Sequence, residues 1–184
     1  MSYALISISD RTGILEFAQE ISNIGFQVIA TSGTQKFLKS KGVNCKTVSE
    51  ITGFPEILGG RVKTLHPKIL GAILANREIE SHLEELKKLK IPLIDIVVCN
   101  LYPFKESPGI ENIDIGGVTL IRSAAKNYKY ITCVTNPNQY KKVIKELKEQ
   151  NEISEQTRFE FAKKAFELTS SFDSSITNFF TTAK

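Results

Sequence analysis

The chain has 184 residues, of which 41% are hydrophobic and 24% are charged, as in an ordinary globular protein. This length suits one domain that buries roughly two-thirds of the surface exposed by the unfolded chain. The net charge is +4, and the basic residues are spread along predicted helices without a basic-aromatic motif, which argues against a nucleic-acid-binding protein and mildly favours anionic metabolites.

The cysteines and histidines argue against a disulfide framework and against a zinc site. Cys45, Cys99 and Cys133 include no close pair, and two of them lie within apolar runs, so we expect buried thiols in a reducing compartment. His66 and His82 cannot supply a usual zinc set. The N-terminus has no signal-peptide profile and no apolar run reaches membrane-spanning length, which predicts a cytoplasmic protein without a membrane partner.

Strand and helix patterns alternate from the N-terminus. Apolar residues recur with helical spacing between Ile14 and Ile24, and Gly25 follows as a helix stop. The elements expected in this part are a strand over 3–9, a helix over 14–24, a strand over 26–30, a helix over 34–41 and a weaker strand over 43–48. The segment 50–76 contains several Gly and Pro residues and gives no clear assignment.

The alternation continues to the C-terminus. The expected elements are a charged helix over 78–89, a strand over 94–101, a helix over 117–126, a strand over 130–135, a helix over 139–149 and a long helix over 154–180, either continuous or broken near Ser170. The strand over 94–101 is almost wholly apolar, as expected when both faces are covered. The pattern predicts a three-layer α/β domain with a mostly parallel sheet, whose ligands bind in the loops after the strands.

Two of those loops carry hydroxyl groups. Ser7 and Ser9 share a face by strand alternation, and they precede the N-terminus of a helix, which attracts phosphate. The alternative is that Asp10 or Thr12 simply caps that helix. After the second strand, residues 31–34 (Thr-Ser-Gly-Thr) repeat the arrangement, which favours a shared site for an anion such as a phosphate monoester.

Residues 59–67 (Gly-Gly-Arg-Val-Lys-Thr-Leu-His-Pro) are the most informative stretch. Two glycines allow close approach of the backbone, Arg61 can grip a phosphate bidentately, and Lys63 is a point charge whose pKa burial can shift. This mixture suits a pocket for a small anion better than a core or a solvated face. For His66, which precedes Pro67, a structural role is favoured over ligand binding.

Two later segments combine polar side chains with strand or helix ends. Asn100 and Tyr102 follow the buried strand and could contact a purine-like edge, or could simply mark a strand end with a turn at Pro103. Asp114 precedes two glycines and a helix that ends near Lys126. Because a ten-residue helix spans roughly 15 Å, Asp114 and Lys126 can serve one site only if the chain folds back over it.

Together these segments resemble the inosine monophosphate cyclohydrolase domain of the bifunctional purine-biosynthesis enzyme. The resemblance covers essentially the whole chain and rests on Gly-Gly-Arg-Val-Lys-Thr-Leu-His-Pro, Asn-Leu-Tyr-Pro-Phe and Asp-Ile-Gly-Gly-Val-Thr-Leu. It implies a fold like that of methylglyoxal synthase. It also implies closure of the purine ring of 5-formamidoimidazole-4-carboxamide ribotide with loss of water, without a cofactor or a metal.

The resemblance also implies site residues. Catalytic roles fall on Lys63, Tyr102, Asp114 and Lys126. Substrate-binding positions are Ser7, Ser9, Asp10, Arg11, Thr31, Ser32, Gly33, Thr34, Arg61, Val62, Thr64, Cys99, Asn100, Ile115 and Gly116. We expect Lys126, oriented by Asp114, to transfer protons, Lys63 to stabilise the oxygen that develops charge, and Tyr102 to order the reacting groups.

The chain departs from the family pattern in a few respects. Arg11 stands where a lysine is usual, and Thr31-Ser32 stands where Ser-Gly is usual, but both substitutions keep anion-binding groups. The family normally continues into a formyltransferase domain, which residues 1–184 do not include, and it tends to form homodimers. Two alternatives remain: a methylglyoxal-synthase-type lyase, and a non-catalytic regulatory domain that binds nucleotides.

Overall fold

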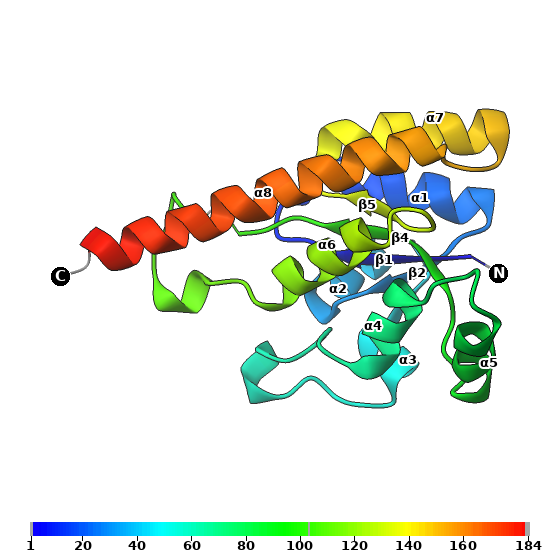
Figure 1. Ribbon diagram of the computed structural model, residues 1–184, viewed down its shortest axis with the longest axis horizontal. Coiled ribbons are helices and arrows are strands. Elements are labelled where there is room, and N and C mark those ends of the chain that lie inside the picture. The colour runs from blue at the N-terminus through cyan, green and yellow to red at the C-terminus, as the bar shows by residue number, and fades with distance from the viewer. Residues whose placement is uncertain (1, 103, 183–184) are drawn as a thin grey trace.

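The computed structural model describes residues 2–102 and 104–182, in which the strands form one sheet with helices on both faces (Figure 1). The strands are β1 (Tyr3–Ser7), β2 (Gln27–Ala30), β3 (Cys45–Thr47), β4 (Ile94–Cys99) and β5 (Thr132–Val134). Their order is β3-β2-β1-β4-β5, and every neighbouring pair is parallel. The predicted three-layer α/β fold is confirmed, and within the described residues the sheet is wholly parallel.

Strand β1 lies at the centre of the sheet, where the direction of strand order reverses. β2 and β3 extend the sheet on one side and β4 and β5 on the other. In this register Ser7, the last residue of β1, pairs with Cys99, the last residue of β4. The loops after β1 and β4 therefore meet at the carboxyl edge, where open α/β sheets bind their ligands.

Side-chain alternation along the strands divides the core into two layers. Ala4 and Ile6 contribute to one layer and Leu5 to the other, because successive strand residues point to opposite faces. The first layer is covered by α1 (Ile14–Ile24), α2 (Ser32–Ser40) and α7 (Tyr140–Gln150). The second is covered by α3 (Val48–Thr52), α4 (Pro67–Leu74), α6 (Gly116–Lys126) and α8 (Glu155–Thr182). Helix α5 (Glu80–Lys88) buries Leu86 against α4.

The segment 50–76, which the sequence did not assign, forms short helices joined by a tight turn. The capping box of Thr47 and Glu50 starts α3, and Gly53 ends it in the left-handed conformation. A 3₁₀ turn over Leu58–Gly60 then folds back so that Ile57 and Val62 form an antiparallel bridge.

His66 caps helix α4. Its Nδ1 accepts a hydrogen bond from the Lys68 N–H at 3.1 Å, and Pro67 occupies the first helical position. The structural role favoured for His66 is confirmed by this contact.

Helix α8 is continuous through Ser170 and extends beyond the sheet at its C-terminal end (Figure 1). The hydroxyls of Ser174 and Ser175 donate to the carbonyl oxygens of Ser170 and Ser171, each at 2.8 Å. These back-bonds satisfy the hydroxyls inside the helix, which explains why the Ser-rich stretch does not interrupt it.

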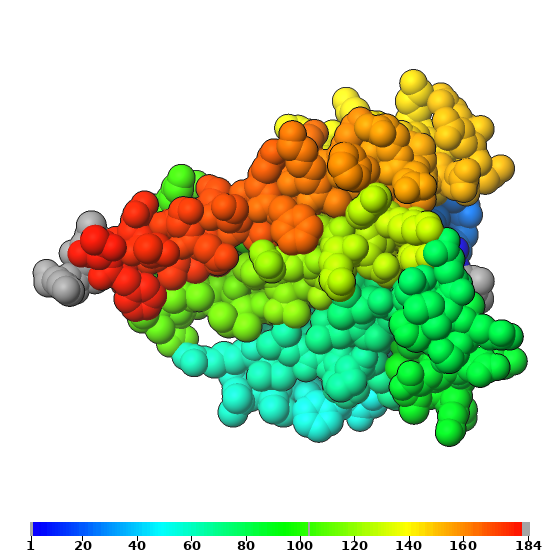
Figure 2. Space-filling view, viewed as in Figure 1, coloured from blue at the N-terminus to red at the C-terminus, as the bar shows by residue number. Residues whose placement is uncertain are grey.

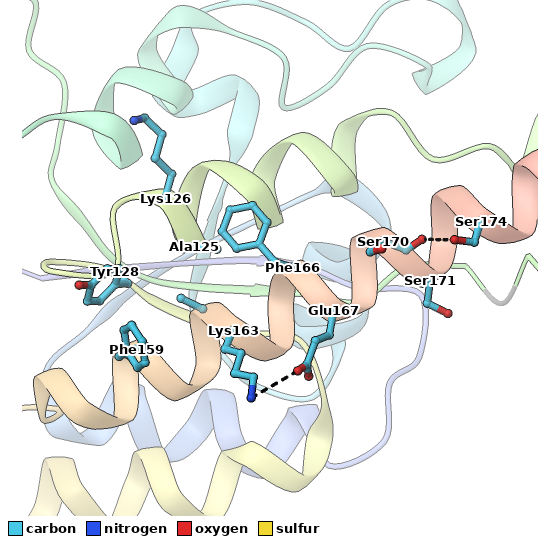
Figure 3. A pocket seen from close by; sticks show the side chains of 11 residues that line it. Ala125, Lys126, Tyr128, Phe159, Lys163, Phe166, Glu167, Ser170, Ser171 and Ser174 are labelled. Atoms are coloured by element: carbon cyan, nitrogen blue, oxygen red, sulfur yellow. Dashed lines mark hydrogen bonds and ion pairs between the residues drawn. The ribbon is translucent and has the colours of Figure 1, made fainter.

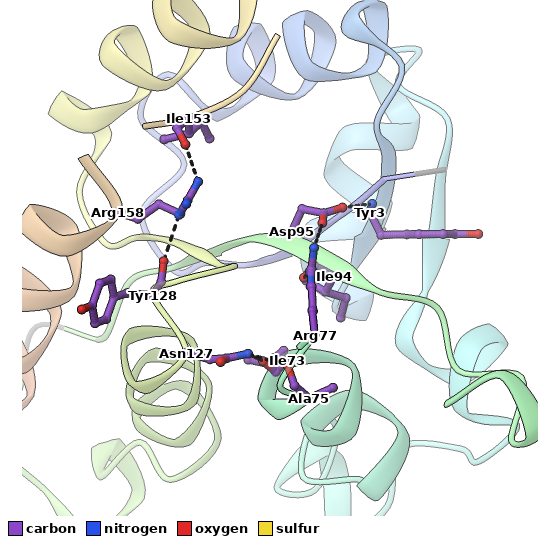
Figure 4. A network of polar contacts seen from close by, with 10 residues as sticks. All are labelled: Tyr3, Ile73, Ala75, Arg77, Ile94, Asp95, Asn127, Tyr128, Ile153 and Arg158. Carbon is purple, nitrogen blue, oxygen red and sulfur yellow. Dashed lines mark hydrogen bonds and ion pairs between the residues drawn. The ribbon is translucent and has the colours of Figure 1, made fainter. Parts of the chain in front are cut away.

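Structural contacts occupy the amino edge of the sheet (Figure 4). Arg77 donates to the Asp95 carboxylate at 2.7 Å and to the Ile94 carbonyl at 2.8 Å, where β4 begins. Asn127, just after α6, donates to the carbonyl oxygens of Ile73 and Ala75. At the amino edge these polar side chains are already hydrogen-bonded to other groups of the chain. We therefore expect the ligand site at the carboxyl edge.

Three further expectations concern thiols, membranes and metals. All three cysteines are free and buried, as predicted, and burial raises the pKa of Cys133 to about 12. Among residues 2–102 and 104–182, no helix is both long and apolar enough to cross a membrane. In the same ranges, no three or more His, Cys, Asp and Glu side chains cluster as metal ligands would.

Candidate functional site

Asn100 joins the loops that follow β1 and β4. Its Oδ1 accepts hydrogen bonds from the Ser9 N–H at 2.7 Å, the Ser9 hydroxyl at 3.0 Å and the Asp10 N–H at 3.2 Å. Its Nδ2 donates to the Asp10 carbonyl at 2.9 Å. The Asn100 amide, which was expected to contact a purine edge, is therefore hydrogen-bonded within the chain. It holds together the loops that follow β1 and β4.

Two expectations for the loop after β1 need correction. Strand β1 ends at Ser7, so strand alternation does not extend to Ser9. Gly13, in the left-handed conformation, is the N-cap of α1, and neither Asp10 nor Thr12 supplies a side-chain cap. Asp10 instead accepts from the N–H and hydroxyl of Thr12, at 2.9 and 2.7 Å, and these bonds hold the pKa of Asp10 below its ordinary value. The loop is thus fixed by its own contacts.

We expect Asn100→Ala to destabilise the fold by about 1–3 kcal/mol, because the Ser9 and Asp10 N–H groups lose their acceptor. Urea unfolding at neutral pH measures this change. Asn44→Ala is the matched control, since Asn44 is an exposed asparagine in the loop before β3. An Asn100→Ala protein as stable as the control would show that the two loops do not depend on this amide.

Helix α2 begins two residues earlier than expected, with only Thr31 between it and β2. Thr31 is its N-cap and supplies no side-chain cap, so Ser32, Gly33 and Thr34 form the first turn. The Thr31 and Thr34 hydroxyls lie 3.3 Å apart and are buried. The carboxylate of Glu56 lies at this helix start, where it accepts from the Ser32 hydroxyl and, at 3.4 Å, from the Ser32 N–H. The loop after β2 therefore already binds one anionic group of the chain itself.

Arg61 is held by another carboxylate of the chain. Its guanidinium donates to both oxygens of Glu111, and both side chains are largely exposed. This pair links the turn around residues 57–62 to the segment before α6, and Figure 2 shows the two segments meeting over a hollow. An exposed pair of this kind stabilises the fold by about 0–1 kcal/mol, so Arg61 exchanges partners at little cost.

Asp114 lies just before α6 and is half-buried. Its Oδ1 accepts a hydrogen bond from the Gly117 N–H at 2.6 Å. Burial raises the pKa of Asp114, while the Gly117 bond and the positive charge of Lys63 oppose that rise. A carboxyl group with a raised pKa exchanges protons closer to neutral pH than an ordinary one, which suits acid–base chemistry.

Two of the four candidate catalytic side chains, those of Asp114 and Lys63, each lie across a glycine. A Cβ at Gly117 would be 2.6 Å from Oδ2 of Asp114, and a Cβ at Gly60 would be 2.7 Å from Cε of Lys63. Gly60 also has a φ of +89°, which other residues rarely adopt. The sequence suggested that glycines admit a ligand to the backbone; in the structure they make room for the chain's own Asp114 and Lys63.

Thr64 joins this cluster from the same segment as Lys63. Its side chain is buried, and its hydroxyl would be 3.2 Å from a Cβ at Gly116. Thr64 and Asp114 thus lie at the N-terminus of α6 within electrostatic range of Lys63, although about fifty positions separate Asp114 from the other two in the sequence.

We expect Gly117→Ala to lower kcat by at least tenfold with little loss of stability. The added methyl group displaces the Asp114 carboxylate, whereas alanine favours the helix by about 1 kcal/mol. Steady-state kinetics and thermal unfolding, measured together, separate the two effects. Gly71→Ala in α4 is the control, because its Cβ would make only ordinary contacts, with Leu86 at 3.7 Å and Ile91 at 3.9 Å. Equal activity of both variants would contradict the close packing of Asp114 on Gly117.

The end of β4 contributes a buried thiol and an exposed phenol. Cys99 donates weakly to the Gly117 carbonyl at 3.7 Å, and burial, with the negative charge of Asp114, raises the pKa of its thiol. Cys99 as a whole is 1% exposed, so its thiol is not open to a ligand. Tyr102 is 58% exposed, and two residues later Phe104 packs edge-to-face on Phe172 of α8, which anchors this loop. The turn considered at Pro103 lies outside the described residues.

The remaining candidate site residues include one, Lys126, that lies far from the carboxyl edge of the sheet. Val62 bridges to Ile57, and Ile115 is the exposed N-cap of α6. Arg11 lies over the Phe37 ring at 4.8 Å. Lys126 is the last residue of α6, roughly 15 Å along the helix from Gly116, so the chain does not fold back to bring it to Asp114.

Lys126 instead borders a groove between α6 and α8 with a volume of about 850 Å³ (Figure 3). Its side chain points away from the Lys163–Glu167 pair on α8. Within one chain, Lys126 and Asp114 therefore lie at opposite ends of one helix.

Two functional groups were missed by sequence reasoning. Glu56 and Glu111 contact Ser32 and Arg61, both of which were assigned to the substrate's phosphate. Neither carboxylate belongs to a segment with a recognisable pattern, and no spacing in the sequence indicates contacts across twenty-four and fifty positions.

This fold and the cluster at its carboxyl edge define a class. The family model of MGS-like domains matches residues 13–135, two-thirds of the chain, and the chain belongs to that family. The family model of the AICARFT/IMPCHase bienzyme matches residues 124–184. The predicted likeness to methylglyoxal synthase in fold, and to the bifunctional purine enzyme in sequence, is therefore confirmed.

Among curated proteins, the chain is similar to the bifunctional purine biosynthesis proteins PurH. It is 50% identical to that of Caldicellulosiruptor saccharolyticus and 52% identical to that of a Thermoanaerobacter species, in each case over 96% of this chain. It spans only 36% of the length of either relative. Among solved structures, it is similar to ForH, with a TM-score of 0.88, 33% identity, and coverage of 97% of this chain and 98% of that one.

Proposed function

We propose that this chain is an inosine monophosphate cyclohydrolase, which closes the purine ring of 5-formamidoimidazole-4-carboxamide ribotide with loss of water. The observation that carries the proposal is the half-buried Asp114 carboxyl, which accepts the Gly117 N–H at the N-terminus of α6 and lies within electrostatic range of Lys63. The similarity to PurH proteins over 96% of the chain supports the same reaction.

The substrate's phosphate is assigned to the start of α2. Thr31, Ser32 and Thr34 offer hydroxyls there, and the first-turn N–H groups carry partial positive charge. The contact of Glu56 with Ser32 supports the assignment, because it shows that this turn binds an anionic oxygen. Arg61 supplies a second charge once it leaves Glu111.

The imidazole with its two side groups is assigned to the Lys63–Asp114 cluster. The carboxamide nitrogen attacks the formyl carbon, whose oxygen takes on negative charge and leaves as water. One proton of that water comes from the carboxamide nitrogen and the other from the formamido nitrogen. Asp114 accepts and returns a proton, and Lys63 stabilises the developing oxyanion, which provides about 10²–10⁴-fold and 10²–10³-fold respectively.

Tyr102, which is exposed and follows the end of β4, orders the reacting groups. Closure is intramolecular, so positioning the two side groups supplies much of the rate. A role for Lys126 stays a prediction from the resemblance. The proton transfer proposed for a single chain uses Asp114, because Lys126 lies at the far end of α6.

The competing functions are less well supported. A methylglyoxal-synthase-type lyase shares the early phosphate loops but has no need of the Lys63, Tyr102 and Asp114 segments. A non-catalytic regulatory domain would bind a nucleotide without turnover. The similarity of the whole chain to PurH proteins favours the cyclohydrolase over both.

Incubation of the purified chain with the formamido ribotide tests the proposal. Formation of inosine monophosphate, followed by its ultraviolet absorbance, is the expected result. The same preparation should release no methylglyoxal from triose phosphate. A folded chain that binds inosine monophosphate but closes no ring would overturn the proposal and favour the regulatory function.

Two further expectations belong to this proposal. We expect the enzyme to work in the cytoplasm, where de novo purine synthesis supplies its substrate, and to form homodimers as its family tends to do. The proposed mechanism requires neither a cytoplasmic location nor a homodimer.

A further inference from the structure

Glu56 occupies a place that the proposed function gives to the substrate. Its Oε1 accepts from both the hydroxyl and the N–H of Ser32, the first residue of α2. Thr31 provides no side-chain cap to this helix, so the Glu56 carboxylate, which comes from a segment twenty-four positions away, takes the place of one. A carboxylate at a helix N-terminus is stabilised by the same N–H groups and partial charge that stabilise a phosphate.

Glu56 also reaches toward the catalytic cluster. Its Oε2 would be 3.8 Å from a Cβ at Gly60, the glycine across which the Lys63 side chain lies. The two oxygens of one carboxylate therefore lie between the start of α2 and Lys63. Glu56 is half-buried, so its negative charge is only partly screened by water.

We propose that Glu56 is an internal competitor for the phosphate site, which the substrate's phosphate displaces. This inference rests on the proposed function, because it assumes that the phosphate binds at the start of α2. A phosphate dianion and the Glu56 carboxylate cannot share the Ser32 N–H and hydroxyl, since two like charges at that distance repel. The dianion offers three oxygens to the Thr31, Ser32 and Thr34 groups and so wins the exchange.

The backbone around Glu56 can accommodate such a displacement. Gly53 before it and Gly59 and Gly60 after it are all left-handed, and Leu58 has a φ of +53° with an exposed side chain. Left-handed glycines flanking a short segment are places where φ and ψ change readily. Movement of this segment shifts Gly60, and with it the room in which Lys63 lies.

The consequence is selectivity for phosphorylated substrates. An uncharged nucleoside cannot displace Glu56, so Lys63 and the turn keep their ligand-free arrangement. A nucleotide displaces the carboxylate and spends part of its phosphate-binding energy on arranging the site, which is how remote binding groups contribute to kcat. Glu56 is thus a specificity-determining residue that contacts no reacting atom.

Binding of inosine monophosphate, inosine and inorganic phosphate to wild type and to Glu56→Gln tests the inference by titration calorimetry. Glutamine keeps an oxygen near Ser32 but removes the charge, so we expect the variant to bind both phosphate-bearing ligands about tenfold more tightly. Affinity for inosine should not change. Glu80→Gln on α5 is the matched control, because it removes the same charge at an exposed position outside the site.

The outcomes separate this inference from the proposed function. Wild type that binds inosine and inosine monophosphate equally well contradicts the phosphate site itself. Wild type that prefers the monophosphate, with Glu56→Gln binding it equally or more weakly, overturns the competitor role alone. Amide resonances of Ser32 and Gly60 give a second readout, because inorganic phosphate should shift both in wild type. If the Gly60 resonance did not shift, the claim that displacement of Glu56 alters the surroundings of Lys63 would be wrong.

Discussion

Asp114→Asn lowers kcat by about 10²–10⁴-fold and raises the melting temperature at pH 7. The amide cannot accept a proton, so acid–base catalysis is lost. Its oxygen still accepts the Gly117 N–H, so the start of α6 is kept. Asp173→Asn, on the exposed surface of α8, is the matched control for charge.

The stability gain follows from the direction of the pKa shift. Burial raises the pKa of Asp114 in the folded protein above its unfolded value of about 3.9. Below about pH 3.9 Asp114 is protonated in both states, and its contribution to the free energy of unfolding is fully present. That contribution is lost as the pH rises through the raised pKa of the folded protein, because the half-buried carboxyl must then become charged. The advantage of asparagine should therefore be present at pH 7 and vanish toward about pH 4. An unchanged kcat, or a variant less stable than wild type at pH 7, would contradict the role of Asp114.

Lys63→Ala lowers kcat by about 10²–10³-fold, because the developing oxyanion loses its positive partner. The affinity for inosine monophosphate should change much less, since the phosphate is held at α2. Lys87→Ala on the exposed face of α5 is the control. Steady-state kinetics with the formamido ribotide measures the first effect, and equilibrium binding the second.

The pH dependence of the Lys63 variant gives an independent readout. The charge of Lys63 opposes the rise in the pKa of Asp114, so its removal moves that pKa further upward. The limb of the pH–rate profile that reports Asp114 should shift to higher pH in Lys63→Ala and return in Lys63→Arg. A profile identical to wild type would place Lys63 too far from Asp114 for the proposed mechanism.

The sequence predicted the fold well because its apolar periodicity is strong. Nearly every expected strand and helix is present, and the alternation was sufficient to infer a parallel sheet with both faces covered. The segment 50–76 could not be assigned, since its order comes from a capping box, left-handed glycines and an antiparallel bridge of single residues. Such contacts leave no periodic trace in a sequence.

The site was predicted in part, and the differences have physical causes. Thr64 and Asp114 lie at the start of α6, and Lys63 lies within electrostatic range of Asp114. Lys126 was expected beside Asp114, but the straight helix between them keeps them apart. The glycine pairs were explained by ligand approach, whereas Gly60 and Gly117 clear space for Lys63 and Asp114. The contacts of Glu56 with Ser32 and of Glu111 with Arg61 could not be predicted, because they join residues far apart in the sequence.

The most direct test of the account is a crystal structure of the chain with inosine monophosphate bound. It should place the phosphate on the N–H and hydroxyl groups of Ser32 and Thr34, with Glu56 moved away from Ser32. The purine should lie beside Lys63 and Asp114. A nucleotide bound elsewhere, such as in the groove between α6 and α8, with Glu56 still on Ser32, would contradict the account.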